Sequence, residues 1–160
     1  MIKQILTILT LSILFVSCEK TDPAIWNKEI IDTYNQTVGD ISDFEDLISS
    51  DKIGNPNAIK DILEKGKSIT DQLEAAIAAI DQKEMPSGAE KYQAAALDMF
   101  QCMKDQISIG LQFTNITDES AEISIDNYAD KYDAASRQTA KKVDSFITCQ
   151  QEFIKAKRIQ

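Results

Sequence analysis

Apolar side chains recur every three or four residues along most of the chain, in four stretches separated by breaks. The stretches run from Ile30 to Ile48, from Ile59 to Ile80, from Tyr92 to Phe113 and from Ala121 to Phe153. This spacing places the apolar side chains on one face of an α-helix, whereas a half-buried strand alternates every second residue. The first stripe consists of Ile30, Tyr34, Val38, Ile41, Phe44 and Ile48. We therefore expect four amphipathic helices.

Proline, glycine and capping residues mark where these helices begin and end. Asp22-Pro23 reads as an N-cap followed by proline at the first helical position. Gly54-Asn55-Pro56 separates the first helix from the second. Ser87 and Glu90 have the spacing of a capping box for the third helix. The segment 115–119 breaks the chain again before the fourth helix.

Short connections between four helices predict an all-α fold, an antiparallel up-down-up-down four-helix bundle with a long fourth helix. The composition agrees, because the 160-residue chain has only five glycines and three prolines. We expect a single bundle domain over residues 23–160. In this topology the start of the first helix and the end of the fourth lie at the same end of the bundle.

Residues 1–18 differ in character from the rest of the chain. Lys3 is the only charge before an apolar run from Ile5 to Val16, and Ser17-Cys18 follows at once. A cationic start followed by a short apolar segment is typical of a secretory signal. The apolar run is about 12 residues long, whereas a stable membrane-spanning helix needs about 20.

The segment ending Leu14-Phe15-Val16-Ser17-Cys18 resembles the lipobox of bacterial lipoproteins, with Phe15 where that family most often has leucine. The resemblance implies that residues 1–17 are removed, that Cys18 is acylated and that residues 18–22 form a short linker. The partner at this end would be the lipid bilayer, because two or more acyl chains give stable anchoring. Glu19 favours the outer membrane, with the domain in the periplasm or on the cell surface. The alternative is a buried apolar helix, or a plain signal peptide with an incidental cysteine.

The residue types needed for common catalytic and metal sites are missing from the sequence. The chain contains no histidine, which is the commonest general base and a preferred zinc ligand. Lys65-Gly66-Lys67-Ser68 lacks the upstream glycine of a phosphate-binding loop. We therefore expect no catalytic residues, no metal, no cofactor and no enzymatic activity, with a carboxylate-based enzyme as a remote alternative. The formal charge of −9 argues against nucleic acid as a partner.

Two cysteines lie within the predicted bundle, Cys102 in the third helix and Cys149 in the fourth. Disulfides persist in exported proteins, so a bond between them is one interpretation. If the intervening turn centres near residue 116, Cys102 faces a position near 130, about 28 Å from Cys149. Two free, buried thiols are the alternative. Trp26 also has two interpretations, since it could pack in the lower end of the bundle or touch the lipid interface.

Acidic residues are concentrated at the end of the bundle that lies away from the predicted anchor. The candidate binding patch consists of Asp40, Asp43, Asp46, Asp126 and Asp130. The acids at the end of the first helix oppose the helix dipole, and in the sequence only Lys52 stands near them. The patch would bind a basic envelope protein, a cationic peptide or a divalent ion. The alternative is an ordinary solvated face.

These features together predict a membrane-anchored, non-enzymatic binding or accessory lipoprotein, similar in plan to small helical envelope lipoproteins of unknown function. One specific form is an immunity or inhibitor protein that captures a basic partner. The second hypothesis is a structural envelope lipoprotein that self-associates through its helices. The sequence leaves the oligomeric state open.

Overall fold

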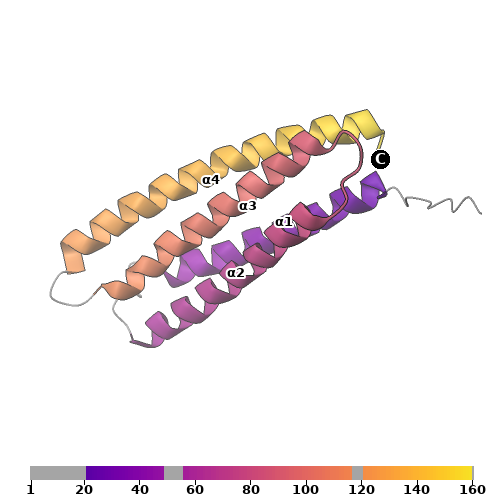
Figure 1. Cartoon of the computed structure of the whole chain (residues 1–160). Helices are drawn as coiled ribbons and strands as arrows, with labels where there is room; N and C mark the ends of the chain where they lie inside the picture. The colour runs from indigo at the N-terminus through magenta and orange to yellow at the C-terminus, as the bar shows by residue number, and fades with distance from the viewer. Residues whose placement is uncertain (1–20, 49–55, 117–120, 160) are drawn as a thin grey trace, which may run out of the picture.

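The computed structural model describes residues 21–48, 56–116 and 121–159 of the chain. The described residues form four α-helices and one short 3-10 helix: α1 (Pro23–Leu47), α2 (Pro56–Gln82), α3 (Glu90–Gly110), η1 (Leu111–Asn115) and α4 (Ala121–Lys157). Successive α-helices run in opposite directions, and α4 is the longest (Figure 1). The predicted all-α, up-down-up-down bundle with a long fourth helix is confirmed. The start of α1 and the end of α4 lie at the same end (Figure 1).

The starts of α1 and α3 show one capping prediction that holds and one that does not. The Asp22 carboxylate accepts the backbone N–H of Ala24 at 2.7 Å and of Ile25 at 3.3 Å, as an N-cap should. The Ser87–Glu90 capping box is wrong, because Ala89 is the N-cap of α3 and no side chain caps it. Gly88 adopts a φ of 81° after Ser87, which places the turn between Ser87 and the helix.

Aromatic side chains from three helices fill the end of the core near the termini. Trp26 is 1% exposed, and its ring centroid lies 5.2 Å from Tyr92 and 5.6 Å from Phe153. Trp26 therefore packs in the bundle, which decides between its two interpretations. Asn27 accepts hydrogen bonds from the Tyr92 hydroxyl at 3.0 Å and from Gln150 at 3.1 Å. These contacts tie α1, α3 and α4 together at this end.

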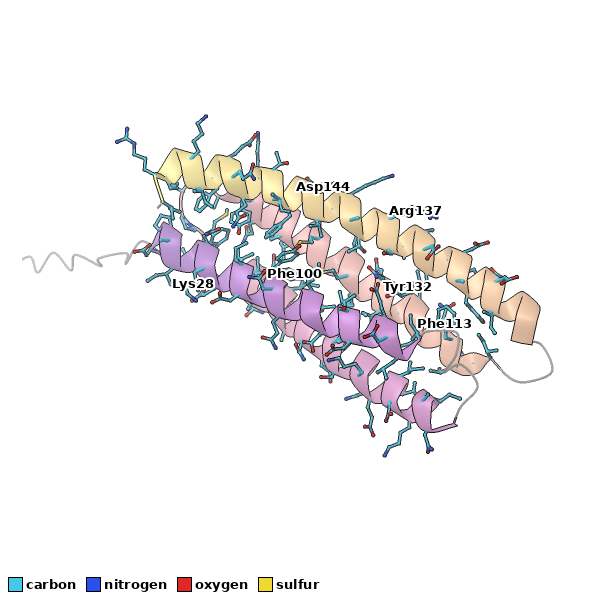
Figure 2. All side chains as sticks on the ribbon, turned by 180° about the vertical axis from the view of Figure 1, so that it is seen from behind. Lys28, Phe100, Phe113, Tyr132, Arg137 and Asp144 are labelled. Carbon is cyan, nitrogen blue, oxygen red and sulfur yellow. The ribbon has the colours of Figure 1, made fainter. Side chains whose placement is uncertain are left out.

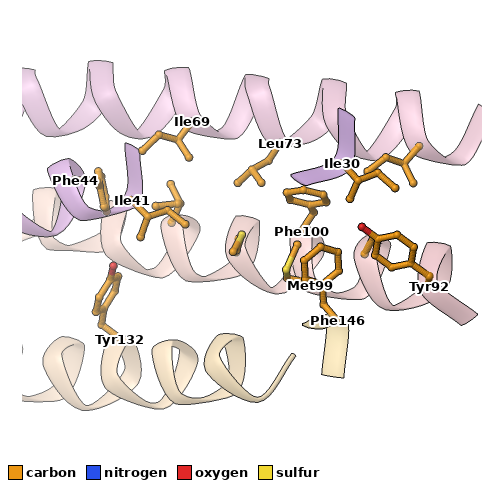
Figure 3. Close-up of a cluster of buried hydrophobic side chains, with 14 of the residues drawn as sticks. Ile30, Ile41, Phe44, Ile69, Leu73, Tyr92, Met99, Phe100, Tyr132 and Phe146 are labelled. Atoms are coloured by element: carbon orange, nitrogen blue, oxygen red, sulfur yellow. The ribbon is translucent and has the colours of Figure 1, made fainter. Parts of the chain in front are cut away.

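Phe44 occupies a notch between two glycines near the other end of the core. The ring is fully buried, and Figure 3 shows it among the side chains of the core. A Cβ built on Gly110 of α3 would lie 2.4 Å from Cε1 of Phe44, and one on Gly66 of α2 would lie 3.0 Å from its Cε2. Only glycine leaves room for the ring at both positions. The ring of Phe44 therefore packs directly against the backbones of both α2 and α3 at this level.

The four helices do not approach one another equally. The closest packing joins α3 with α4, α2 with α3 and α1 with α2, whereas α1 and α4 approach each other much less. The view in Figure 2 looks onto these two helices, with α3 behind the space between their ribbons. In the described part of the chain, no helix has the length and apolar character needed to cross a bilayer.

Candidate functional site

A groove of about 360 Å³ lies between α1 and α4, with α3 behind it. Its floor includes Met103 and Gln106 of α3, both buried. The walls are formed by Val38, Ile41, Ser42 and Glu45 of α1 and by Ser136, Thr139, Ala140, Val143 and Asp144 of α4. Most of these side chains are apolar or small, and the groove is open to solvent at its rim.

The groove runs between two direct contacts of α1 with α4. On the side near the termini, the rings of Tyr34 and Phe146 pack with centroids 5.4 Å apart. On the other side, the Tyr132 hydroxyl donates a hydrogen bond to Oε1 of Glu45 at 3.1 Å. Tyr34 and Glu45 are eleven residues apart on one helix, which corresponds to about 16 Å. The groove therefore extends over about three helical turns.

The hydrogen bond at Glu45 belongs to a three-residue network from three helices. Nε2 of Gln106 donates to the Tyr132 hydroxyl at 3.0 Å and to Oε1 of Glu45 at 3.2 Å. Burial raises the pKa of the Tyr132 phenol above its ordinary value, so the hydroxyl stays protonated and remains a donor at physiological pH. Both of these donors use Oε1 of Glu45, and Glu45 itself is exposed.

A second hollow of about 350 Å³ continues the groove beyond Glu45. Glu45 and Ser136 line both hollows. The remaining lining residues of the second hollow are Ile48, Phe113, Ala129, Tyr132 and Asp133. The two hollows together contain three carboxylates, those of Glu45, Asp133 and Asp144, and the described residues that line them include no lysine or arginine. The groove therefore combines apolar side chains, those of Val38, Ile41, Met103 and Val143, with an acidic rim.

The structure separates the five acids of the predicted patch into two environments. Nζ of Lys65 on α2 lies 2.6 Å from Oδ1 of Asp40 and 3.0 Å from Oδ2 of Asp43. The hydrogen bond to Asp40 raises the pKa of the Lys65 ammonium above its ordinary value, against the opposing effect of burial. The expectation that only Lys52 stands near these acids is therefore wrong, because α2 supplies a base that is distant in sequence.

Asp126 and Asp130 are exposed on α4, and Asp46 is exposed on α1. Asp126, Asp130 and Asp133 follow one another at spacings of four and three residues, so they share one face of α4. Asp133 lines the groove, but none of the five predicted residues does. The predicted patch therefore shares one face of α4 with Asp133, but it does not include the acids that line the groove, Glu45, Asp133 and Asp144. Val38 belongs to the apolar stripe of α1 but is 42% exposed, a difference that the sequence pattern alone does not show.

Cys102 and Cys149 are free thiols in the structure, so the predicted disulfide alternative is not what the structure contains. Gln138 and Thr139 of α4 contact Cys102 through its sulfur and its carbonyl oxygen. Cys149 is ten residues beyond Thr139, about 15 Å along the helix, and a disulfide allows a Cα separation of only about 7 Å. The expected partner near residue 130 was also wrong, because η1 lengthens the connection and shifts the register.

The predicted signal segment 1–17 and the predicted lipidation site Cys18 lie outside the described residues. Comparisons of the chain with protein-family models, with curated proteins and with solved structures found no match.

Proposed function

We propose that this chain is a lipid-anchored, non-enzymatic binding protein that holds a cationic protein or peptide at the bacterial cell envelope. The observation that carries the proposal is the groove between α1 and α4. It combines apolar side chains with the carboxylates of Glu45, Asp133 and Asp144, and none of its described lining residues is basic. A partner with both apolar and cationic side chains complements such a surface, and the electrostatic part of the attraction also speeds association.

The anchor part of the proposal rests on the lipobox-like segment ending at Cys18. The described bundle begins with α1 at Pro23, so an anchor at Cys18 would hold that end of the bundle close to the membrane. Glu45 follows Pro23 by 22 residues of continuous helix, which is about 33 Å. Anchored in this way, the chain would present its groove to partners well clear of the lipid headgroups.

The test compares two variants that lose equal charge. One variant converts Glu45, Asp133 and Asp144 to their amides, and the other converts Asp61, Glu64 and Asp81, which are exposed on α2. Fluorescence anisotropy of labelled poly-lysine, at low and at high salt, measures binding. We expect salt-sensitive binding that the groove variant loses and the α2 variant keeps. Equal binding by the two variants would show that net charge alone attracts the probe, and would refute the groove as the site.

A further inference from the structure

The part of the groove between its two contacts has an unusual pattern of exposure. Val38 of α1 is 42% exposed, and Val143, which faces the groove from α4, is only partly buried. Between them, the rim consists of the small side chains of Ser42, Ser136 and Ala140. The small side chains let another backbone approach closely. The exposed apolar side chains would then be buried against it. The groove therefore has the surface of a helix–helix interface that lacks one helix.

Backbone chemistry restricts what can fill such a groove. Its walls are α-helices, whose backbone N–H and C=O groups bond within each helix. An extended peptide would find no backbone partners there and would leave its own buried amide groups unpaired. A helical peptide satisfies its own backbone and presents apolar side chains at spacings of three and four residues. A small amphiphile would keep much of its surface in water, because the rim is open, whereas small-molecule sites usually enclose most of the ligand.

We infer that the groove between α1 and α4 docks a basic amphipathic α-helix of the partner as a fifth helix. This inference rests on the proposed function and adds the conformation of the bound segment. Apolar side chains of the docked helix cover Val38, Ile41 and Val143, and Ser42 and Ala140 give it room to approach. Asp133 and Asp144 are eleven residues apart on one face of α4, about 16 Å. Lysine or arginine side chains about three turns apart on the partner can therefore pair with both.

Glu45 is the positioning element of this inferred interface. Tyr132 and Gln106 hold Oε1 of its carboxylate from the floor of the groove, at 3.1 and 3.2 Å. The carboxylate is thus fixed in place on the α1 side, across from the acids of α4. Because the Glu45 side chain is already ordered, pairing with a base on the docked helix costs little further side-chain entropy. This favours one defined register of the docked helix.

Two peptides of identical composition test the inference. Both contain about 14 residues of leucine and lysine, the length of four helical turns. In the first, leucine recurs at helical spacings of three and four, and in the second, leucine and lysine alternate as in a strand. The full chain is reconstituted in phosphatidylcholine nanodiscs, because basic peptides bind anionic lipid, and empty nanodiscs give the blank. Fluorescence anisotropy measures affinity, and circular dichroism of the difference spectrum measures peptide helicity.

We expect the helical peptide to bind at least tenfold more tightly than its isomer and to gain helicity on binding. Ala140→Trp fills the groove and should weaken binding at least tenfold. Ala134→Trp, on the opposite face of the same helix, should not. Thermal melts of the two variants show whether each is folded. If Ala140→Trp is unfolded, Ser42→Trp on the facing helix takes its place with the same expectation.

The possible outcomes separate this inference from the proposed function. If both peptides bind equally and the triple amide variant of the groove binds neither, cationic capture stands but the docked helix is refuted. If neither peptide binds more strongly to the parent than to that variant, both proposals fail. If sedimentation shows that the parent self-associates and that Ala140→Trp abolishes the association, the occupant is a second copy of the chain. That result also overturns the inference.

Discussion

Gly110→Ala tests whether the Phe44 notch shapes the bundle. The new Cβ would lie 2.4 Å from Cε1 of Phe44, 3.0 Å from its Cζ and 3.0 Å from Cε2 of Tyr132. Carbon atoms pack best at about 3.5–4.0 Å, and the Phe44 ring is fully buried. Overpacking of this kind costs about 1–3 kcal/mol. Alanine regains about 1 kcal/mol of helix propensity relative to glycine. Because three contacts are too close, we take the upper part of this range, about 2–3 kcal/mol, and expect a net loss of about 1–2 kcal/mol.

Gly39→Ala is the matched control, because a Cβ at this exposed position of α1 would meet nothing within 4 Å. Without a clash, only the helix propensity acts, and we expect a gain of about 0.5–1 kcal/mol. Gly66→Ala should fall between the two, since its nearest contact, at 2.5 Å, is the end of the Leu111 side chain, which is only partly buried.

Urea denaturation of residues 21–160, followed by circular dichroism at 222 nm, gives the free energy of unfolding of each variant. We expect Gly39→Ala to raise the free energy of unfolding and Gly110→Ala to lower it, so that the two variants differ by about 2 kcal/mol or more. Combining Phe44→Leu with Gly110→Ala should reduce the cost of the alanine, because the ring that it meets is gone. A Gly110→Ala protein as stable as the parent would refute the notch.

Three further predictions address charge, ionisation and the anchor. The folded pKa values of Tyr92 and Tyr132 are raised by burial above the unfolded value of about 10. The stabilisation is therefore complete below about pH 10 and is lost as the pH rises above it, so alkaline titration should show their tyrosinate absorbance appearing only together with unfolding. Asp40→Asn, which breaks the partly buried pair with Lys65, should cost up to about 1 kcal/mol in urea denaturation, and Asp126→Asn should change stability by less than about 0.5 kcal/mol. Cys18→Ala should abolish labelling by an alkyne fatty acid and release the protein from the membrane fraction, whereas retention of the unlabelled variant in the membrane would contradict the lipid anchor.

The periodicity of the sequence was sufficient to predict the helices and their antiparallel order. The stripe of α4 is a clear case, because Tyr132, Thr139, Phe146 and Phe153 are all buried as expected. Short connections then leave little choice of topology. The α3–α4 register was not predictable, because the repeat does not reveal that the helical path continues through η1.

The groove escaped prediction for a related reason. A stripe shows which face of a helix is buried, but it does not show which of the four helix interfaces is loose. In the structure Phe44 of α1 packs against Gly66 of α2 and Gly110 of α3, whereas α1 approaches α4 much less, and neither fact can be read from one stripe. The two environments of the acidic patch were hidden for a similar reason, since the pairing of Asp40 with Lys65 depends on how α1 is rotated against α2. The sequence signal that could have pointed to the Phe44 notch is the pair of glycines, Gly66 and Gly110, within predicted helices.

Zero-length cross-linking tests the central claim, that the groove holds a cationic partner, most directly. A carbodiimide joins a lysine of the bound helical peptide to a carboxylate in direct contact with it, and mass spectrometry identifies the carboxylate. The account predicts that cross-links concentrate on Glu45, Asp133 and Asp144. Exposed acids of α2 such as Asp61 and Asp81 should react little. Cross-links spread over all acids in proportion to their exposure would contradict it.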